Sequence, residues 1–166
     1  ALALAGCVSA AQSITEPGQI KVTDDPYRPY REYTTGEIKS ANAVGIGAKQ
    51  LVGRIDRATG ALTTVLQFEI AYQAYARRHY ETARNAKAET LTFNQVQKTA
   101  RCRPGADCVY GEQFIVTLPE AHLRAAGPEG YSVKVFARSG PDVLVALPKD
   151  MIDSLLARID ADRKRV

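Results

Sequence analysis

Apolar and polar positions alternate along most of the chain after residue 43, and a period of two is typical of half-buried β-strands. The pattern is clearest over residues 61–73, where Leu62, Leu66 and Ile70 fall on even positions and polar side chains occupy most odd ones. The turn residues Thr59-Gly60 precede this segment. The pattern therefore predicts a long antiparallel hairpin formed by residues 44–56 and 61–73.

Further strands are predicted downstream. Residues 79–84 and 89–101 are predicted to form a second hairpin around a turn at 85–87. Alternation breaks within 89–101, and a bulge near Asn94-Gln95 would restore it. The remaining alternating segments are residues 109–118, 131–138 and 142–147.

Two segments have a helical pattern instead. Residues 119–126 start with Pro119 and stop before Gly127, which are preferred residues at helix starts and ends. A longer helix is predicted after Pro148, with one apolar face made by Ile152, Leu155, Leu156 and Ile159. The predicted fold is mainly β: an antiparallel β-sandwich or strongly curved sheet, with a short helix and a C-terminal helix that caps an open edge or one face.

The first 35 residues have a different pattern. Pro17, Pro26 and Pro29 interrupt a polar stretch and favour extended geometry. We expect residues 7–35 to form a tether in front of a single globular domain at 36–166. Tyrosines alternate with arginine and proline near the end of this stretch, a composition suited to docking a partner or a sugar. We expect instead that these tyrosines fold back on their own domain.

The chain starts with an apolar, alanine-rich run that ends in Leu4-Ala5-Gly6-Cys7. This motif resembles the lipobox of bacterial lipoproteins. The resemblance implies that residues 1–6 are the remnant of a signal peptide, that cleavage occurs before Cys7, and that Cys7 carries lipid. Val8 follows the cysteine, and in the enteric sorting pattern this favours the periplasmic face of the outer membrane. The alternative is an apolar terminus without such a role.

The other two cysteines, Cys102 and Cys108, flank a turn that contains Pro104-Gly105. The turn can bring them into bridging range, and an exported protein meets oxidising conditions. We expect a structural disulfide. Redox or metal use is the alternative, but the spacing is longer than Cys-x-x-Cys and no further zinc ligands lie nearby.

The net charge of +4 is concentrated in one segment. Residues 77–103 hold seven basic side chains and two acidic ones, Glu81 and Glu89. A basic patch can bind an anionic surface, and a solvated sheet face is the alternative. The candidate partner-binding residues are Arg77, Arg78, Arg84, Lys87, Lys98, Arg101 and Arg103. We also expect that charge reversal at Arg77 and Arg78 leaves the fold intact.

No catalytic motif is apparent. The two histidines, His79 and His122, have no carboxylate or cysteine at ligand spacing. Glu112 shares its strand face with apolar residues, so its carboxylate needs a partner, and Arg101 or Arg77 can supply it. We predict neither a metal nor a cofactor.

Together these patterns predict a chain of 166 residues with one domain and no enzymatic activity. We expect a lipid-anchored periplasmic protein that serves as an accessory or structural binding subunit of a cell-envelope assembly. Its expected contacts are the membrane, through Cys7, a protein partner and an anionic surface, but no nucleic acid. A small-ligand or glycan-binding module is the first alternative, and an envelope hydrolase is the second.

Overall fold

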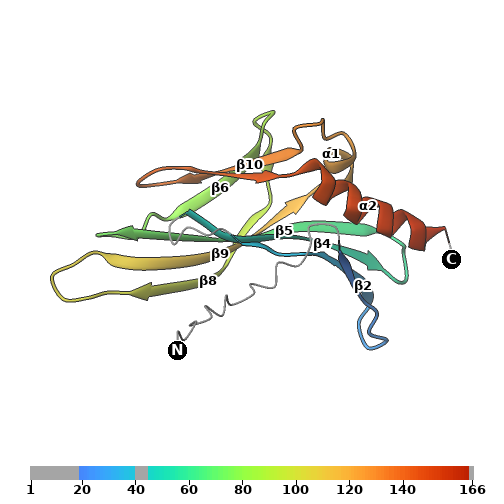
Figure 1. Cartoon of the computed structure of the whole chain (residues 1–166), viewed down its shortest axis with the longest axis horizontal. Helices are drawn as coiled ribbons and strands as arrows, with labels where there is room; N and C mark the ends of the chain where they lie inside the picture. Colours follow the sequence, from blue (N-terminus) through green and yellow to red (C-terminus); the bar gives the residue numbers. More distant parts are fainter. Residues whose placement is uncertain (1–18, 40–44, 165–166) are drawn as a thin grey trace, which may run out of the picture.

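The computed structural model describes residues 19–39 and 45–164, in which two antiparallel sheets stack face to face (Figure 1). The larger sheet has seven strands in the order β1-β2-β4-β5-β9-β8, with β3 also paired to β4. These strands are β1 (Ile20–Thr23), β2 (Tyr30–Thr35), β3 (Ile38–Lys39), β4 (Gly45–Asp56), β5 (Leu62–Ala74), β8 (Phe93–Arg101) and β9 (Cys108–Leu118). The smaller sheet has the order β11-β10-β6-β7 and contains β6 (Tyr80–Asn85), β7 (Thr90–Leu91), β10 (Tyr131–Ala137) and β11 (Val143–Leu147). The predicted mainly β sandwich is confirmed.

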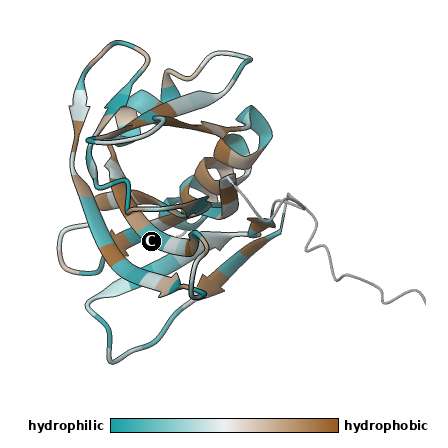
Figure 2. Ribbon diagram, turned by 90° about the vertical axis from the view of Figure 1, so that its left-hand side faces the viewer, coloured by the Kyte–Doolittle hydropathy of each residue, from teal (hydrophilic) through white to brown (hydrophobic). Residues whose placement is uncertain are grey.

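The long β4–β5 hairpin matches its prediction closely. The two strands pair from Ile55 with Leu62 to Gly45 with Ala71, interrupted by a bulge between Ile46 and Ala48. Apolar and polar positions alternate along the strands, as the hydropathy colours of Figure 2 show. The β10–β11 hairpin is also confirmed.

The second predicted hairpin forms over two residue pairs and is wrong beyond them. Across its turn β6 pairs with the two-residue strand β7, and its other edge pairs with β10. After β7 the chain changes sheets at Thr92. The rest of the expected strand is β8, which pairs with β9 at the edge of the larger sheet. A bulge does occur between Gln95 and Gln97, close to its predicted position, but it faces β9. Alternation alone shows that a segment is extended but does not show which strand it pairs with.

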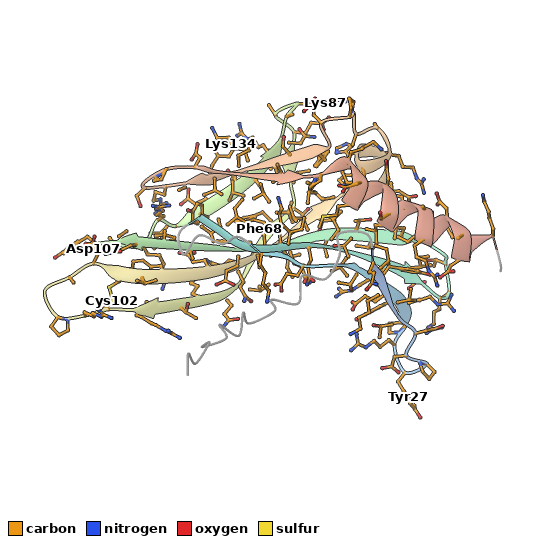
Figure 3. The ribbon with its side chains drawn as sticks, in the orientation of Figure 1. Tyr27, Phe68, Lys87, Cys102, Asp107 and Lys134 are labelled. Atoms are coloured by element: carbon orange, nitrogen blue, oxygen red, sulfur yellow. A yellow bond between two sulfur atoms is a disulfide. The ribbon has the colours of Figure 1, made fainter. Side chains whose placement is uncertain are left out.

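The core lies between the two sheets. Figure 3 shows Phe68 in this layer, and its ring stacks on Phe114 with centroids 5.4 Å apart. Phe93 stacks on Phe114 at 5.0 Å, and Tyr80 meets the same ring edge-on at 5.5 Å. Aromatic pairs of this kind stabilise a core by roughly 0.5–1.5 kcal/mol beyond area burial. The aromatic cluster therefore connects β5, β8 and β9 to the smaller sheet.

Both predicted helices are confirmed: α1 (Glu120–Arg124) and α2 (Lys149–Arg163). The predicted apolar face of α2 is buried, and it packs against β1, β2 and β4 beside the smaller sheet. A Cβ atom at residue 53 would lie 2.8 Å from Cδ1 of Ile159. Gly53 therefore allows the helix to approach β4 closely, and α2 covers one face of the larger sheet.

The expected tether does not extend to residue 35. β1 and β2 are strands of the larger sheet, and Tyr33 is fully buried. Its hydroxyl donates a hydrogen bond of 3.1 Å to the buried carboxylate of Asp162 on α2. The tether prediction is therefore wrong for residues 20–35, because the alternation of β2 is short and the nearby prolines obscure it. Residues 7–18, including Cys7, lie outside the described residues.

Gly130 closes the turn between α1 and β10. Its φ angle is +81°, and a Cβ atom there would lie 2.0 Å from the carbonyl oxygen of Leu147. Gly127 begins the same turn, but a Cβ atom at that position would meet nothing within 4 Å. Only the second glycine is therefore required by geometry.

Candidate functional site

Three connections lie at the same end of the sandwich, on the left of Figure 1. They are the β5–β6 crossover at residues 75–79, the β8–β9 turn at 102–107 and the β10–β11 turn at 138–142. These connections and the strand ends beside them hold five arginines. We call this region the arginine-rich end, and its arginines are Arg77, Arg78, Arg101, Arg103 and Arg138.

Backbone hydrogen bonds hold the crossover against the β10–β11 turn. The amide of Ser139 donates to the carbonyl of Arg78 at 3.1 Å, and the amide of Arg138 donates to the carbonyl of His79 at 2.9 Å. The Ser139 hydroxyl also donates to the Arg78 carbonyl, at 3.1 Å. His79 has a φ of +53°, a conformation that few residues adopt outside turns. The crossover is thus a fixed connection between the two sheets.

A buried carboxylate lies beneath the crossover. Glu112 on β9 is fully buried, and its oxygens accept hydrogen bonds from the Tyr72 hydroxyl and the Gln95 side-chain amide. Nη1 of Arg77 lies 3.3 Å from Oε1 of Glu112. The predicted pairing of Glu112 is confirmed with Arg77. Since a buried charge is tolerated only when it is paired and hydrogen-bonded, these three partners explain how Glu112 fits the core.

Aromatic rings support the two crossover arginines. Tyr72 and Tyr110 stack with centroids 5.2 Å apart. The guanidinium carbon of Arg77 lies 4.9 Å from the Tyr110 centroid, and that of Arg78 lies 4.3 Å from the Tyr72 centroid. Burial raises the pKa of Tyr72 above its usual value, so its hydroxyl stays protonated and can donate to Glu112. The rings fix both side chains by cation–π contact.

The other partners of Glu112 were not predicted from the sequence. The alternation in β5 does place Tyr72 on the inward face, which was a usable signal. The pairing of Tyr72 with Tyr110 depends on the β5–β9 register, and Gln95 reaches the site only through the β8 bulge. Arg138 was also missed, because it lies outside the basic segment and joins this end only in the folded chain.

The structure does not gather the seven predicted partner-binding residues into one patch. Arg77 and Arg78 lie in the crossover, and Arg77 forms an ion pair with Glu112. Lys98 and Arg101 lie on β8, and Arg103 lies in the following turn. Five of the seven therefore lie at the arginine-rich end or along the hairpin that leads to it.

The other two basic residues lie on the smaller sheet. Arg84 is on β6, and its guanidinium carbon is 5.4 Å from the Phe136 centroid on the exposed face. The ammonium of Lys134 lies 5.1 Å from the same ring. Lys87 occupies the β6–β7 turn, away from the β8–β9 tip marked by Cys102 and Asp107 in Figure 3. These cations form a separate basic surface.

The basic segment 77–103 has fewer ion pairs than the rest of the described chain. Among the predicted seven, only Arg77 forms an ion pair with a described carboxylate. Most basic residues elsewhere in the described ranges have such a partner: Arg28, Arg31, Lys39, Arg54, Arg57, Arg124, Lys134, Arg138, Lys149, Arg158 and Arg163. Six cations of the segment thus have no ion-pair partner among the described residues: Arg78, Arg84, Lys87, Lys98, Arg101 and Arg103.

The predicted disulfide is confirmed: Cys102 and Cys108 are bonded, with Cα atoms 4.1 Å apart. The bond closes the β8–β9 turn at the tip of the hairpin (Figure 3). Because Cys108 is the first residue of β9, the disulfide fixes the register at the point where the two strands separate.

The tyrosines of the N-terminal stretch have different environments. Tyr33 is buried, and the Tyr30 ring lies under the guanidinium of Arg54, 5.0 Å from its centroid. Folding back is therefore confirmed for these two. Tyr27 is 95% exposed at the tip of the β1–β2 turn, where Figure 3 shows it pointing away from the body.

The histidines do not form a catalytic arrangement with the described residues. His122 Nδ1 lies 3.3 Å from the Tyr131 hydroxyl, and its Nε2 lies 3.5 Å from a Glu89 oxygen. Neither His122 nor His79 has a serine or aspartate side chain at hydrogen-bond distance within the described ranges. In the same ranges no three His, Cys, Asp or Glu side chains group as metal ligands would.

A cavity of about 450 Å³ lies at the C-terminal end of α2, lined in part by Arg31, Tyr33, Ile55 and Asp162. Arg31 lies 3.9 Å from Asp162 and 2.5 Å from Asp24, so the charged groups facing this cavity neutralise one another. It therefore offers weaker attraction for an anion than the arginine-rich end does.

None of the described helices is both long enough and apolar enough to cross a bilayer. Comparison of the chain with protein-family models, with curated proteins and with solved structures finds no match.

Proposed function

We propose that this protein is a non-enzymatic binding subunit of a cell-envelope assembly, held on a membrane by lipid on Cys7. Its arginine-rich end and the adjoining β8–β9 hairpin bind an acidic protein partner. The periplasmic face of the outer membrane is the proposed location. The basic residues of segment 77–103 lie on several elements, which suits a partner that contacts more than one strand.

The unpaired cations carry this proposal. Six of the seven basic residues of the segment have no described carboxylate partner, whereas most other described cations have one. Like charges close together repel, so the cations that lie near one another at the arginine-rich end and along the β8–β9 hairpin lower the stability of the free protein. An acidic partner would neutralise these charges and would be steered toward them at low ionic strength.

The anchor and the disulfide support the same proposal. A lipid on Cys7 would concentrate the domain at a membrane surface, so contacts that are weak in solution become effective there. The Cys102–Cys108 disulfide suits an oxidising compartment outside the cytosol. Both features agree with the expected export route, which the lipobox resemblance implies.

The anchor has a direct test. Mass spectrometry of the protein extracted from membranes of the cells that produce it should show a chain that starts at Cys7 and carries acyl mass. The Cys7→Ser variant should lose this mass and leave the membrane fraction. A chain with an unmodified Cys7 thiol in the soluble fraction would refute the anchoring.

The binding surface needs a test that spares the fold. Arg77 is unsuitable because reversing its charge would place a second carboxylate beside buried Glu112. For Arg77 we therefore expect charge reversal to disturb the fold, in contrast to the expectation from the sequence. Arg101→Glu with Arg103→Glu changes two exposed, unpaired side chains instead. Lys21→Glu with Lys164→Glu makes the same change in net charge at sites away from the hairpin.

Photo-crosslinking in intact cells can then compare these variants. A photoreactive residue at Asp107, on the hairpin tip, should capture an acidic envelope protein. The hairpin variant should capture much less of it, and the control variant should capture as much as wild type. Equal capture by all three proteins at low salt would refute the proposed surface.

A further inference from the structure

β8 is the longest open edge in the described structure. It has nine residues, whereas the other edge strands β1, β3, β7 and β11 have four, two, two and five. The β11 edge is partly covered, because the Lys49 ammonium donates to the carbonyl of Ala146. An exposed edge presents unpaired backbone N–H and C=O groups, which can pair with a strand from another chain.

At the end of β8 near the disulfide, the side chains are exposed as well as the backbone edge. All its side chains from Val96 to Arg101 are exposed, and the hairpin extends past the smaller sheet in Figure 1. Thr117 donates its amide to the carbonyl of Thr92, which fixes the alternation of hydrogen bonds between β8 and β9. With the bulge at 95–97, this alternation leaves the amides of Lys98 and Ala100 on the open edge.

Charge selects the kind of strand that this edge can accept. Lys98, Arg101 and Arg103 line the open end, and none forms an ion pair with a described carboxylate. A second copy of this chain would bring two such basic edges together, and repulsion opposes that pairing. Lys98 and Arg101 lie on opposite faces of β8, so an acidic strand with carboxylates on both of its faces would pair with both cations across the new ladder.

We infer that residues 97–101 of β8 accept an extended acidic segment of the partner protein as an additional strand of the larger sheet. This inference rests on the proposed function and adds the mode of binding to it. Backbone hydrogen bonds give the affinity, and carboxylates on the two faces of the added strand give the specificity. The disulfide keeps the receiving strand in register beyond the cover of the smaller sheet.

The competing explanation is edge protection. Lysines and bulges are devices by which proteins prevent unwanted strand pairing. The bulge lies at 95–97, so it would block only the first half of β8. If the edge only prevents strand pairing, no peptide should slow hydrogen exchange at its open amides. If the edge accepts a strand, an acidic peptide should slow this exchange.

Three peptides of about seven residues, a typical strand length, separate these cases. The first repeats Glu-Glu-Val, so its glutamates lie on both faces when it is extended. The second has the same sequence but is N-methylated on every residue, so it keeps its charge but neither of its edges can donate backbone hydrogen bonds. The third replaces glutamate by glutamine. The readouts are the dissociation constant at low salt and the hydrogen-exchange rates of the Lys98 and Ala100 amides in the full chain.

We expect the acidic peptide to bind at least about tenfold more tightly than the other two and to slow exchange at Lys98 and Ala100. The hairpin variant Arg101→Glu with Arg103→Glu should lose this binding, and Lys21→Glu with Lys164→Glu should retain it. Equal affinity for the N-methylated peptide, with no slowing of exchange, would overturn strand addition while leaving charge-driven binding in place. Failure of both acidic peptides to bind, or binding only to vesicles of anionic lipid, would overturn the proposed acidic protein partner as well.

Discussion

The Arg77–Glu112 ion pair makes a quantitative prediction about stability. Arg77→Met keeps most of the apolar stem of the side chain and removes the charge next to a carboxylate that is fully buried. At 3.3 Å, the gross attraction between the two charges is about 5 kcal/mol for an effective dielectric constant of about 20. Removing one partner of a buried pair typically costs about 3–5 kcal/mol.

Two features of the site reduce this cost. Glu112 retains hydrogen bonds from Tyr72 and Gln95, and the Arg77 side chain is 21% exposed, so part of its charge is already solvated. We therefore expect Arg77→Met to lower the free energy of unfolding by about 2–4 kcal/mol. The control is Arg138→Met, which removes an ion pair with Glu81 between two exposed side chains. That change should cost less than about 1 kcal/mol.

A double-mutant cycle with Glu112→Gln isolates the ion pair. The glutamine keeps the size of the side chain and an acceptor for Tyr72, so the double variant should be less destabilised than the sum of its parts. We expect a coupling energy of at least about 1.5 kcal/mol, measured by urea denaturation at pH 7. Additivity of the two single changes within about 0.5 kcal/mol would show that the pair does not hold the crossover.

Three further predictions concern other parts of the fold. Replacing Cys102 and Cys108 by serine should lower the free energy of unfolding by about 2 kcal/mol, because the closed loop is short, and equal stability in urea with and without reductant would contradict this. Burial raises the pKa of Tyr72 above 10.0, so the folded chain keeps a proton that the unfolded chain loses. Stability should therefore fall as pH rises above about 10, and Tyr72→Phe should remove up to about 1.4 kcal/mol per pH unit of that slope in alkaline denaturation. Gly130→Ala should lower the free energy of unfolding by at least about 3 kcal/mol, since a backbone oxygen occupies the space of the new methyl group, whereas Gly127→Ala should be tolerated, and equal melting temperatures of these two variants would refute the argument.

The strands and helices were largely predictable because their patterns are local. The hairpin of β4 and β5, the bulge in β8 and the apolar face of α2 all follow from spacing along the chain. The change of sheets at Thr92 was not predictable in this way. It depends on β8 burying Phe93 against Phe114 on β9, which is a contact between distant segments.

The N-terminal stretch shows a second limit. Its prolines suggested an extended tether, yet β1 and β2 join the sheet and Tyr33 reaches Asp162, 129 positions further along the chain. Proline fixes local geometry but does not prevent a neighbouring segment from pairing, provided the proline lies in a turn. Pro26 and Pro29 lie in the β1–β2 turn and outside both strands.

The two arginines of the crossover are adjacent in sequence but have different environments. Arg77 points inward, and Glu112 neutralises it, so its charge contributes to the fold and is not available to a partner. Arg78 lies on Tyr72, the same ring whose hydroxyl donates to Glu112, and it has no described carboxylate partner. Tyr72 contacts both arrangements, and its hydroxyl keeps its acceptor on Glu112 when Arg77 is replaced, so Arg78 should keep its position. The buried carboxylate therefore fixes part of the surface that we propose for binding through Tyr72, and Arg77→Met should reduce stability while the folded protein still captures its partner.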